Sequence, residues 1–245
     1  MKYGIADYGM NVWDGECFDS EERWKQLRSI GYEGVERLNV TTAEEAVWKA
    51  ATLRKLGMDF ATLRGPTAES SIRLTAAFGK AYTWTVSYQV DFDNLCRQVN
   101  IQVEACERFG IHLALHNHMG TAVETQEQLV EFMSSCPKAK LLLDVGHLAA
   151  MNGDPVEMIY KFADRLETIH LKDWKETNSQ EKNWSQRGHF CALGEGNIGL
   201  DNAEVMKALH KVGFTSWVFV EHDTHLQEPL EDLAKSRQFL RDIGF

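Results

Sequence analysis

CERFGIHLALHNH, residues 106–118, contains the structural unit that is repeated along the chain. A helical run ends at Gly110, where a helix C-cap favours a left-handed residue, and a short apolar strand follows. The same order, with a glycine or a similar helix breaker, recurs in LRSIGYEGVERLN (27–39), LRKLGMDFATLRG (53–65), LTAAFGKAYTWTV (74–86), ADRLETIHLKDW (163–174) and LHKVGFTSWVFVEHD (209–223). A variant, SSCPKAKLLLDVGH (134–147), has Pro137 in place of the glycine. The chain is therefore expected to alternate helices with strands.

With an opening strand, this repeat predicts eight strands. They lie near residues 3–8, 34–39, 58–63, 81–87, 111–117, 140–145, 166–172 and 216–222. Helices are predicted between them, for example at Glu21–Ile30, Ala43–Leu56, Asn94–Phe109 and Ala203–Val212. Because strands that alternate with helices are joined by crossover connections, the sheet should be parallel, and eight such units close into a barrel.

The pattern thus predicts a single (β/α)8 TIM barrel that occupies residues 1–245, without an internal linker. An open doubly wound sheet is the alternative, but the GxGxxG that typically follows its first strand is absent from the sequence. The longest polar interruption, residues 175–199, is expected to be a long loop that covers a site at the mouth of the barrel.

Composition excludes several classes of function. The net charge of −10 argues against a nucleic-acid-binding surface, which needs clustered Lys and Arg. The five cysteines are scattered without CxxC spacing, so reduced thiols are expected. Neither a signal peptide nor an apolar run long enough to span a membrane is recognisable. We expect a soluble cytoplasmic protein with no membrane partner. A homo-oligomer is compatible with the sequence, although nothing in it determines the oligomeric state.

Ionisable residues accumulate where the later predicted strands end. Since residues two apart in a strand share a face, parity groups four sets of side chains. The sets are Ala114, His116 and His118; Leu142 and Asp144; Thr168, His170 and Lys172; and Phe219, Glu221 and Asp223. If each set faces the barrel axis, His116, Asp144, His170 and Glu221 meet at one height.

Convergence of these four groups would be costly without a compensating ion, because buried charges need partners. Two imidazoles and two carboxylates suit a first-row divalent metal such as Mn, Fe, Co or Zn, and Mg is a further candidate. A single His at a strand end is more often hydrogen-bonded or solvated, but four successive strands that end this way favour a metal site. We therefore predict one divalent ion at the C-terminal mouth of the barrel.

Other candidate residues lie outside this set. The segment GEGNIG (194–199) is glycine-rich and resembles a phosphate-binding loop, although such loops are common. Glu195 within it is a candidate contact for a substrate hydroxyl, or simply a partner of Lys or Arg. Trp13, Trp84 and Trp174 fall at predicted strand ends, where aromatic faces pack on sugar rings or fill the core. Of these we count Trp13 and Trp174 as candidate substrate-binding residues.

The sequence resembles the xylose-isomerase-like superfamily of sugar isomerases, epimerases, inosose dehydratases and endonuclease IV. The resemblance covers almost the whole chain. Its specific segments are LALHNHMGT (113–121), LLLDVGHL (141–148), TIHLKDW (168–174), LGEGNIGLD (193–201) and VFVEHD (218–223). Members of the superfamily commonly bind one divalent metal through Glu, Asp, His and Glu on four consecutive strands. The resemblance implies that Asp144, His170 and Glu221 match the last three of these ligands, and that His147 and Lys172 contact substrate.

The first ligand position departs from this pattern. Isomerases and epimerases usually have a glutamate there, which works with the second glutamate to move a proton beside a carbonyl. This chain has His116, so only Glu221 remains of that pair. The segment HNHMGT resembles inosose dehydratases more closely, which makes His118 a candidate acid or base.

Two reactions remain open from the sequence. The resemblance favours metal-dependent proton transfer beside the carbonyl of a small sugar or sugar-like polyol ketone, as in an isomerase or epimerase. Glu221, His118 and Lys172 are then the expected catalytic groups. The alternative is an inosose- or dehydroshikimate-type dehydratase, in which His118 or Lys172 protonates the departing hydroxyl. A carbohydrate or cyclitol is the expected partner in both reactions. A remote third alternative is a sugar-binding barrel without catalysis, and the acidic charge argues against a nuclease.

Overall fold

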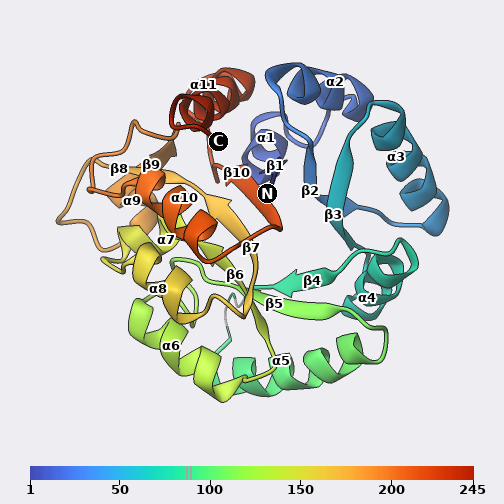
Figure 1. The fold of residues 1–245 in the computed structure, drawn as a ribbon, viewed down its shortest axis with the longest axis horizontal. Coiled ribbons are helices and arrows are strands. Elements are labelled where there is room, and N and C mark those ends of the chain that lie inside the picture. Colours follow the sequence, from blue (N-terminus) through green and yellow to red (C-terminus); the bar gives the residue numbers. More distant parts are fainter. Residues whose placement is uncertain (87, 89) are drawn as a thin grey trace.

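The computed structural model describes residues 1–86, 88 and 90–245 and contains an eight-stranded parallel sheet rolled into a barrel (Figure 1). Its strands are β1 (Lys2–Ala6), β2 (Gly34–Asn39), β3 (Asp59–Arg64), β4 (Tyr82–Thr85), β5 (His112–His116), β6 (Lys140–Asp144), β7 (Leu166–Leu171) and β10 (Trp217–Glu221). The order across the sheet is β3-β2-β1-β10-β7-β6-β5-β4. The strands β3 and β4 lie next to each other at the seam where the ladder is open. The predicted TIM barrel is confirmed.

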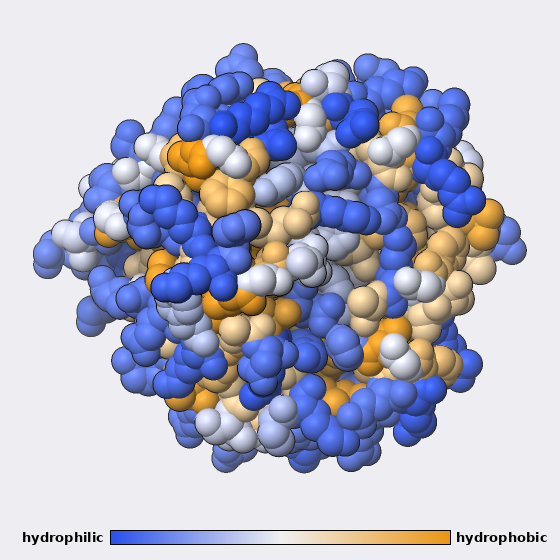
Figure 2. Space-filling view, viewed as in Figure 1, coloured by the Kyte–Doolittle hydropathy of each residue, from blue (hydrophilic) through white to orange (hydrophobic). Residues whose placement is uncertain are grey.

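Helices surround the barrel in the ribbon view (Figure 1). They are α1 (Tyr8–Trp13), α2 (Ser20–Ile30), α3 (Ala43–Lys55), α4 (Ala68–Ala77), α5 (Phe92–Glu107), α6 (Gln126–Ser135), α7 (Val145–Ala150), α8 (Pro155–Lys161), α10 (Asn202–Lys211) and α11 (Pro229–Asp242). Hydrophilic residues cover most of the face seen in Figure 2, with hydrophobic patches between them. Within the described residues, no helix combines the length and apolar character that crossing a membrane requires.

Local sequence explains where the helices begin and end. The side chains of Asp19, Thr42 and Asp91 each accept a hydrogen bond from a backbone N–H in the first turn of the following helix. At the other end, Gly31 has a φ of 110° and Gly110 a φ of 69°, which confirms the left-handed stops expected from the sequence. Each helix is thereby limited to the length that returns the chain to the barrel.

The predicted strands agree with the observed ones to within two residues at each end, and the largest differences are at the ends of the first and fourth strands. The first strand was expected to include Tyr8, but it ends at Ala6, and Tyr8 begins α1. The fourth was expected to reach residue 87, which lies outside the described residues. The segment 175–199 also holds more regular structure than a loop. The antiparallel strands β8 (Asp173–Glu176) and β9 (Gly188–Cys191) pair, and α9 (Trp184–Arg187) lies between them.

Two hydrophobic layers hold the barrel. The large outer cluster packs the outward faces of the strands against the helices. The inner cluster fills the barrel with alanine, aromatic and leucine side chains, namely Ala6, Ala61, Tyr82, Ala114, Leu142, Trp217 and Phe219, with Trp84 packed against it. Ala114, Leu142 and Phe219 belong to the inner cluster, as strand parity predicts, so the residues two positions further along each strand reach the mouth.

Candidate metal centre and cavity

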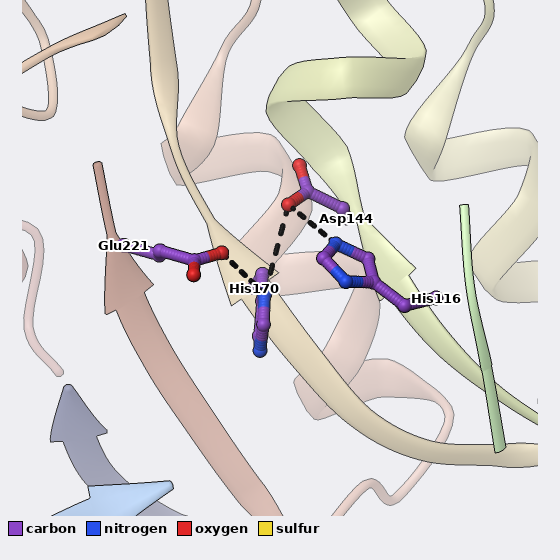
Figure 3. Close-up of side chains that lie close together, drawn as sticks. All are labelled: His116, Asp144, His170 and Glu221. Carbon is purple, nitrogen blue, oxygen red and sulfur yellow. Dashed lines mark hydrogen bonds and ion pairs between the residues drawn. The ribbon is translucent and has the colours of Figure 1, made fainter. Parts of the chain in front are cut away.

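Four side chains converge at the C-terminal ends of neighbouring strands (Figure 3). His116 is the last residue of β5, Asp144 of β6 and Glu221 of β10, and His170 lies one residue before the end of β7. The Oδ2 of Asp144 lies 3.2 Å from His116 Nε2 and 3.6 Å from His170 Nδ1. His170 Nδ1 is also 2.7 Å from Glu221 Oε2. The structure thus brings together all four residues that strand parity grouped.

Local structure fixes the orientation of Asp144. This residue is the N-cap of α7, and its Oδ1 accepts a hydrogen bond of 2.9 Å from the backbone N–H of His147. The side chain of Asn117 bridges to the backbone of Asp144, accepting from its N–H at 2.9 Å and donating to its carbonyl at 3.0 Å. Because Oδ1 is engaged by the helix, Oδ2 is left to face the two imidazoles.

A buried carboxylate on β2 orients His170. The Nε2 of His170 lies 2.8 Å from Glu36 Oε1, and Glu36 is only 2% exposed. Since a carboxylate accepts, the Nε2–H of the imidazole donates to Glu36, and Nδ1 is the nitrogen that a metal ion would bind. Burial alone would lower the pKa of His170, but Glu36 and Glu221 outweigh it and raise that pKa well above its usual value, so a metal ion would replace the proton on Nδ1. A carboxylate behind an imidazole is the usual outer support of a metal-binding histidine.

The donor set fits a divalent metal ion. One nitrogen or oxygen from each of the four residues lies within 4.8 Å of the others, and all four residues are buried. Within the described part of the chain, His116 Nδ1 is a buried atom without a hydrogen-bond partner, and the buried His170 Nδ1 and Glu221 Oε2 face each other at 2.7 Å. Buried polar atoms are costly unless they are paired, and a cation can pair with them. Two imidazoles and two carboxylates are ligands for first-row divalent metals.

Lys172 contacts this cluster and is fully buried. Its Nζ is 3.1 Å from Asp144 Oδ2, 2.9 Å from Glu221 Oε2 and 3.0 Å from Asp223 Oδ1. Burial alone would lower the pKa of Lys172, but the three carboxylates outweigh it and hold that pKa well above its usual value. The permanent positive charge keeps the neighbouring carboxylates ionised.

A second group of ionisable residues, His118, His147 and Asp223, lies beside the first. The rings of His118 and His147 are 3.6 Å apart between centroids, and His118 Nε2 lies 3.9 Å from Asp223 Oδ2. Burial, with His147 and Lys172 nearby, lowers the pKa of His118 to about 3, so the imidazole is neutral. Trp184 of α9 brings its ring to 5.8 Å from that of His118, so the 175–199 segment reaches the mouth.

A cavity of about 430 Å³ opens onto the site. His116, His118, Glu221 and Asp223 contribute to its lining, together with residues of β2, β3 and β4. Its size suits a small polyol. His147 and Lys172 are absent from this lining and are both fully buried, so they support the site from behind.

Three residues that the sequence singled out for substrate binding do not line this cavity within the described structure. Trp13 is 47% exposed at the end of α1. Trp174 is fully buried and packs on Phe190, with ring centroids 4.9 Å apart. Glu195 is exposed, and its carboxylate lies 3.5 Å from Lys235 Nζ. It therefore pairs with a lysine, which is the second of the two alternatives that the sequence left open for it. These tryptophans follow strand ends in sequence, but α1 and β8 carry them away from the opening.

Sequence reasoning missed Glu36, Trp184 and two arginines of the cavity wall, Arg37 and Arg64. Glu36 lies in the strand segment GVERLN, where a single carboxylate looks like a surface residue. The signal that points to it is chemical. A metal-binding histidine needs an acceptor on its second nitrogen, and a carboxylate on another strand of the closed barrel supplies one.

Comparisons with known proteins agree with this architecture. The profile of the family described as "Xylose isomerase-like TIM barrel" matches residues 24–243. An inosose dehydratase of Clostridium botulinum (strain Alaska E43 / Type E3) is 32% identical over 145 residues, which cover 54% of this chain and 48% of the relative. The chain therefore aligns with only about half the length of that curated relative.

Solved structures match along almost the whole chain. The probable 3-DHS dehydratase AsbF of Bacillus anthracis superposes with a TM-score of 0.78 at 14% identity, covering 98% of this chain and 99% of that one. The IOLI protein with a bound zinc atom superposes with a TM-score of 0.74 at 15% identity, covering 99% and 98%. At such low identity these two matches establish the fold alone. The family profile spans most of the sequence, and the chain belongs to the xylose isomerase-like TIM barrel family.

Proposed function

We propose that this protein is a metal-dependent dehydratase that removes water from a small polyol ketone, a sugar or a cyclitol. The observation that carries the proposal is the position of His118. Its imidazole lines the cavity beside the candidate metal centre, and the carboxylate of Asp223 lies 3.9 Å from its Nε2 in the same lining. Of the two reactions that the sequence left open, the dehydratase alternative receives the stronger support, and the isomerase or epimerase expectation receives less.

The metal would be held by His116, Asp144, His170 and Glu221. A divalent ion at this position would supply a Lewis acid that stabilises negative charge developing on the substrate's carbonyl oxygen. Because Glu36 accepts the Nε2–H of His170, Nδ1 is the nitrogen of this imidazole that would bind the ion. The ion's identity follows from availability and geometry more than from ligand type.

Hydrogen bonding defines the tautomer of His118. Its Nδ1 lies 2.6 Å from the carbonyl oxygen of Met119, and since a carbonyl can only accept, Nδ1 carries the hydrogen. The Nε2 of the neutral ring therefore presents a lone pair. Asp223 Oδ2, 3.9 Å away, is placed to stabilise the imidazolium that forms when Nε2 accepts a proton. His118 thus has the geometry of a general base.

In the proposed dehydration, His118 alone carries out both proton transfers. His118 Nε2 takes the proton from the carbon beside the carbonyl, and a carbon–carbon double bond forms as the bond to the β-hydroxyl breaks. The imidazolium then returns the proton to the departing hydroxyl, which leaves as water. The net change is the loss of one water molecule, with no oxidant or reductant.

The surroundings of Glu221 argue against the two-glutamate proton transfer of isomerases. Its Oε2 lies 2.9 Å from Lys172 Nζ and 2.7 Å from His170 Nδ1, so this oxygen is engaged by two partners and is not free to take a proton. Burial would raise the pKa of Glu221, but Lys172 and His170 lower it well below its usual range. The position of a second glutamate is taken by His116. The name of the curated relative, inosose dehydratase, supports the same choice.

The test is a substrate panel followed by NMR in D2O. The metal-loaded protein is incubated with inosose, with 3-dehydroshikimate and with open-chain keto-sugars. Dehydration gives olefinic signals and loss of a hydroxyl-bearing carbon. Deuterium incorporation without loss of water would contradict the proposal and support an isomerase.

Two variants separate the roles of base and metal. His118→Asn should reduce dehydration by about 10²- to 10⁴-fold while leaving bound metal unchanged. Asp144→Ala should remove most of the roughly one divalent ion per chain that elemental analysis is expected to find. His210→Ala, on the exposed side of α10, is the matched control and should change neither. Full metal content in Asp144→Ala would overturn the assignment of the centre.

A further inference from the structure

The cavity that contains the metal-binding cluster also contains two arginines. Arg37 comes from β2, and Arg64 is the last residue of β3. The two positions are 27 residues apart in the sequence, but β2 and β3 pair in register, with Arg37 opposite Thr62 and Asn39 opposite Arg64. Strand pairing therefore places two guanidinium groups on the wall of one small cavity.

Arg37 is connected to the candidate metal centre through a single aromatic side chain. Its guanidinium carbon lies 4.8 Å from the centroid of the Trp84 ring. The Trp84 ring in turn meets the His116 ring edge-on, with centroids 5.3 Å apart. Stacking on Trp84 restricts the guanidinium while leaving its N–H donors free, which is favourable for binding a ligand.

Neither arginine has a carboxylate within ion-pairing distance among the residues that the structure describes. Burial raises the pKa of Asp7, and the charges of Arg37 and Arg23 lower it in part, so Asp7 lies near Arg37, although its ion pair, at 3.8 Å, is with Arg23. Burial and the charge of Arg37 lower the pKa of Arg64, which shows that the two cations are close enough to repel each other. Two like charges held close together, with no carboxylate at ion-pairing distance among the described residues, are typical of an anion-binding wall.

We propose that Arg37 and Arg64 bind an anionic group of the substrate, either a carboxylate or a phosphate. The substrate is then an anionic keto-polyol rather than an uncharged cyclitol ketone. The inference rests on the proposed function for its chemistry, but the arginines recognise the charge whatever reaction follows. A planar guanidinium donates two parallel hydrogen bonds to a carboxylate or a phosphate. These bonds orient the substrate in the cavity and also contribute to its binding affinity.

This placement assigns separate tasks to the two sides of the cavity. The anionic group contacts the β2–β3 wall, and the carbonyl and hydroxyl groups face His118 and the metal-binding cluster. The hydroxyl side chain of Thr83 lies in the same lining and offers a hydrogen bond to a polyol. An uncharged cyclitol would leave both guanidinium groups without a partner, so it should bind more weakly.

The first arm of the test measures binding without turnover. Calorimetry compares shikimate with its methyl ester, and ribose 5-phosphate with ribose, on the metal-loaded protein. None of the four is a β-hydroxy ketone in the ring form, so the reaction does not interfere. We expect one anionic member to bind at least about tenfold more tightly than its uncharged counterpart, and which pair shows the preference identifies carboxylate or phosphate. Equal affinity within both pairs would overturn the proposal.

The second arm uses variants. Arg37→Gln and Arg64→Gln should each weaken binding of the preferred anion by about ten- to hundredfold, and the double variant should abolish the preference over the uncharged partner. Arg37→Lys keeps the charge but loses the planar fork, so it should retain only part of the affinity. Arg54→Gln, at the exposed end of α3, is the matched control and should leave binding unchanged.

The outcomes distinguish this inference from the proposed function. Arginine-dependent anion binding with no dehydration of any keto-polyol would contradict the dehydratase assignment and leave the anion site standing. Dehydration of inosose with the same KM and kcat as 3-dehydroshikimate would retain the dehydratase and overturn the anion site. A thermal unfolding measurement on each variant identifies those that fail to fold. If a glutamine variant does not fold, the affinity of Arg37→Lys for the preferred anion tests the anion site instead, and unchanged affinity would contradict it.

Discussion

Glu36 shows how one residue on a distant strand prepares the candidate metal centre. It is buried on β2 and accepts the Nε2–H of His170 at 2.8 Å, which leaves Nδ1 as the donor that faces Asp144 and Glu221. Carboxylates behind metal-binding histidines also raise the basicity of the imidazole. All four expected ligands can be named from their own strand ends, but the nitrogen with which His170 faces the centre depends on Glu36.

Replacing this carboxylate should weaken the centre without removing a ligand. Glu36→Gln keeps an oxygen acceptor near His170 but removes the negative charge, so we expect metal affinity to fall by about 10- to 100-fold. Competition with a chromophoric chelator measures the change. Glu104→Gln, exposed on α5, serves as the control. Unchanged affinity in Glu36→Gln would show that the hydrogen bond does not support the metal.

At the scale of elements, α6 illustrates a helix stop that the repeat does not explain. Most helix ends in this chain use a glycine, but α6 is followed by Cys136 and Pro137. Arg165, just before β7, substitutes for the glycine. Its guanidinium donates to the carbonyl oxygens of Met133 at 2.6 Å, Cys136 at 2.6 Å and Ala139 at 2.6 Å. These bonds satisfy carbonyls at the end of a helix that no further turn can reach.

Removal of this guanidinium should therefore destabilise the fold. Arg165→Met leaves several carbonyls without a donor, and we expect a loss of about 3 kcal/mol in the free energy of unfolding. Urea denaturation followed by circular dichroism measures it. Arg165→Lys should recover only part of the loss, since an ammonium group cannot reach three carbonyls in one plane. The exposed Arg108→Met is the comparison, and an equal effect there would contradict the assignment.

For the whole molecule, closure of the barrel depends on matching small and large residues in its interior. A Cβ added at Gly4 of β1 would lie 2.5 Å from Phe219 Cε1 and 2.9 Å from the carbonyl oxygen of Gly34. Phe219 fills the barrel directly below Glu221, two residues before it on β10. The absence of a side chain at Gly4 thus makes room for the aromatic layer on which the metal-binding residues rest.

Overpacking at Gly4 should lower the stability of the barrel, and a smaller side chain at position 219 should compensate for part of the loss. Gly4→Ala should lower the free energy of unfolding by about 1–3 kcal/mol because the methyl group displaces the Phe219 ring. Phe219→Leu alone should also destabilise the barrel, but the double variant should lose less than the sum of the two single changes. Chemical denaturation of all four proteins gives the coupling. Strict additivity would show that the two residues do not share the same space.

Sequence periodicity was sufficient for the fold because each helix–glycine–strand unit is local. The glycine conformation, the capping side chains and the apolar strand lie within about fifteen residues of one another, so the unit is legible without tertiary information. Errors appeared where local signals conflict with packing. Tyr8 follows the apolar strand after one charged residue but begins α1, and the polar segment 175–199 contains α9, β9 and the end of β8.

The metal centre could be anticipated in part for a related reason. In a closed parallel barrel the C-terminal ends of all strands face one mouth, so strand parity brings His116, Asp144, His170 and Glu221 together once the strands are known. Their role as ligands remains a prediction. The substrate contacts proposed for Trp13, Trp174 and Glu195 depended on loop direction, which parity does not provide.

The sequence alone determined that this chain folds as a TIM barrel with ionisable groups at its mouth, because strand period and helix stops are properties of neighbouring residues. Tertiary structure alone decided which carboxylate orients His170, which carbonyl fixes the tautomer of His118, and that Arg37 and Arg64 share a wall with the candidate metal centre. These relations join residues on different strands or depend on the path of a loop. They are set by the register and curvature of the closed sheet, which are defined only when all eight strands have packed.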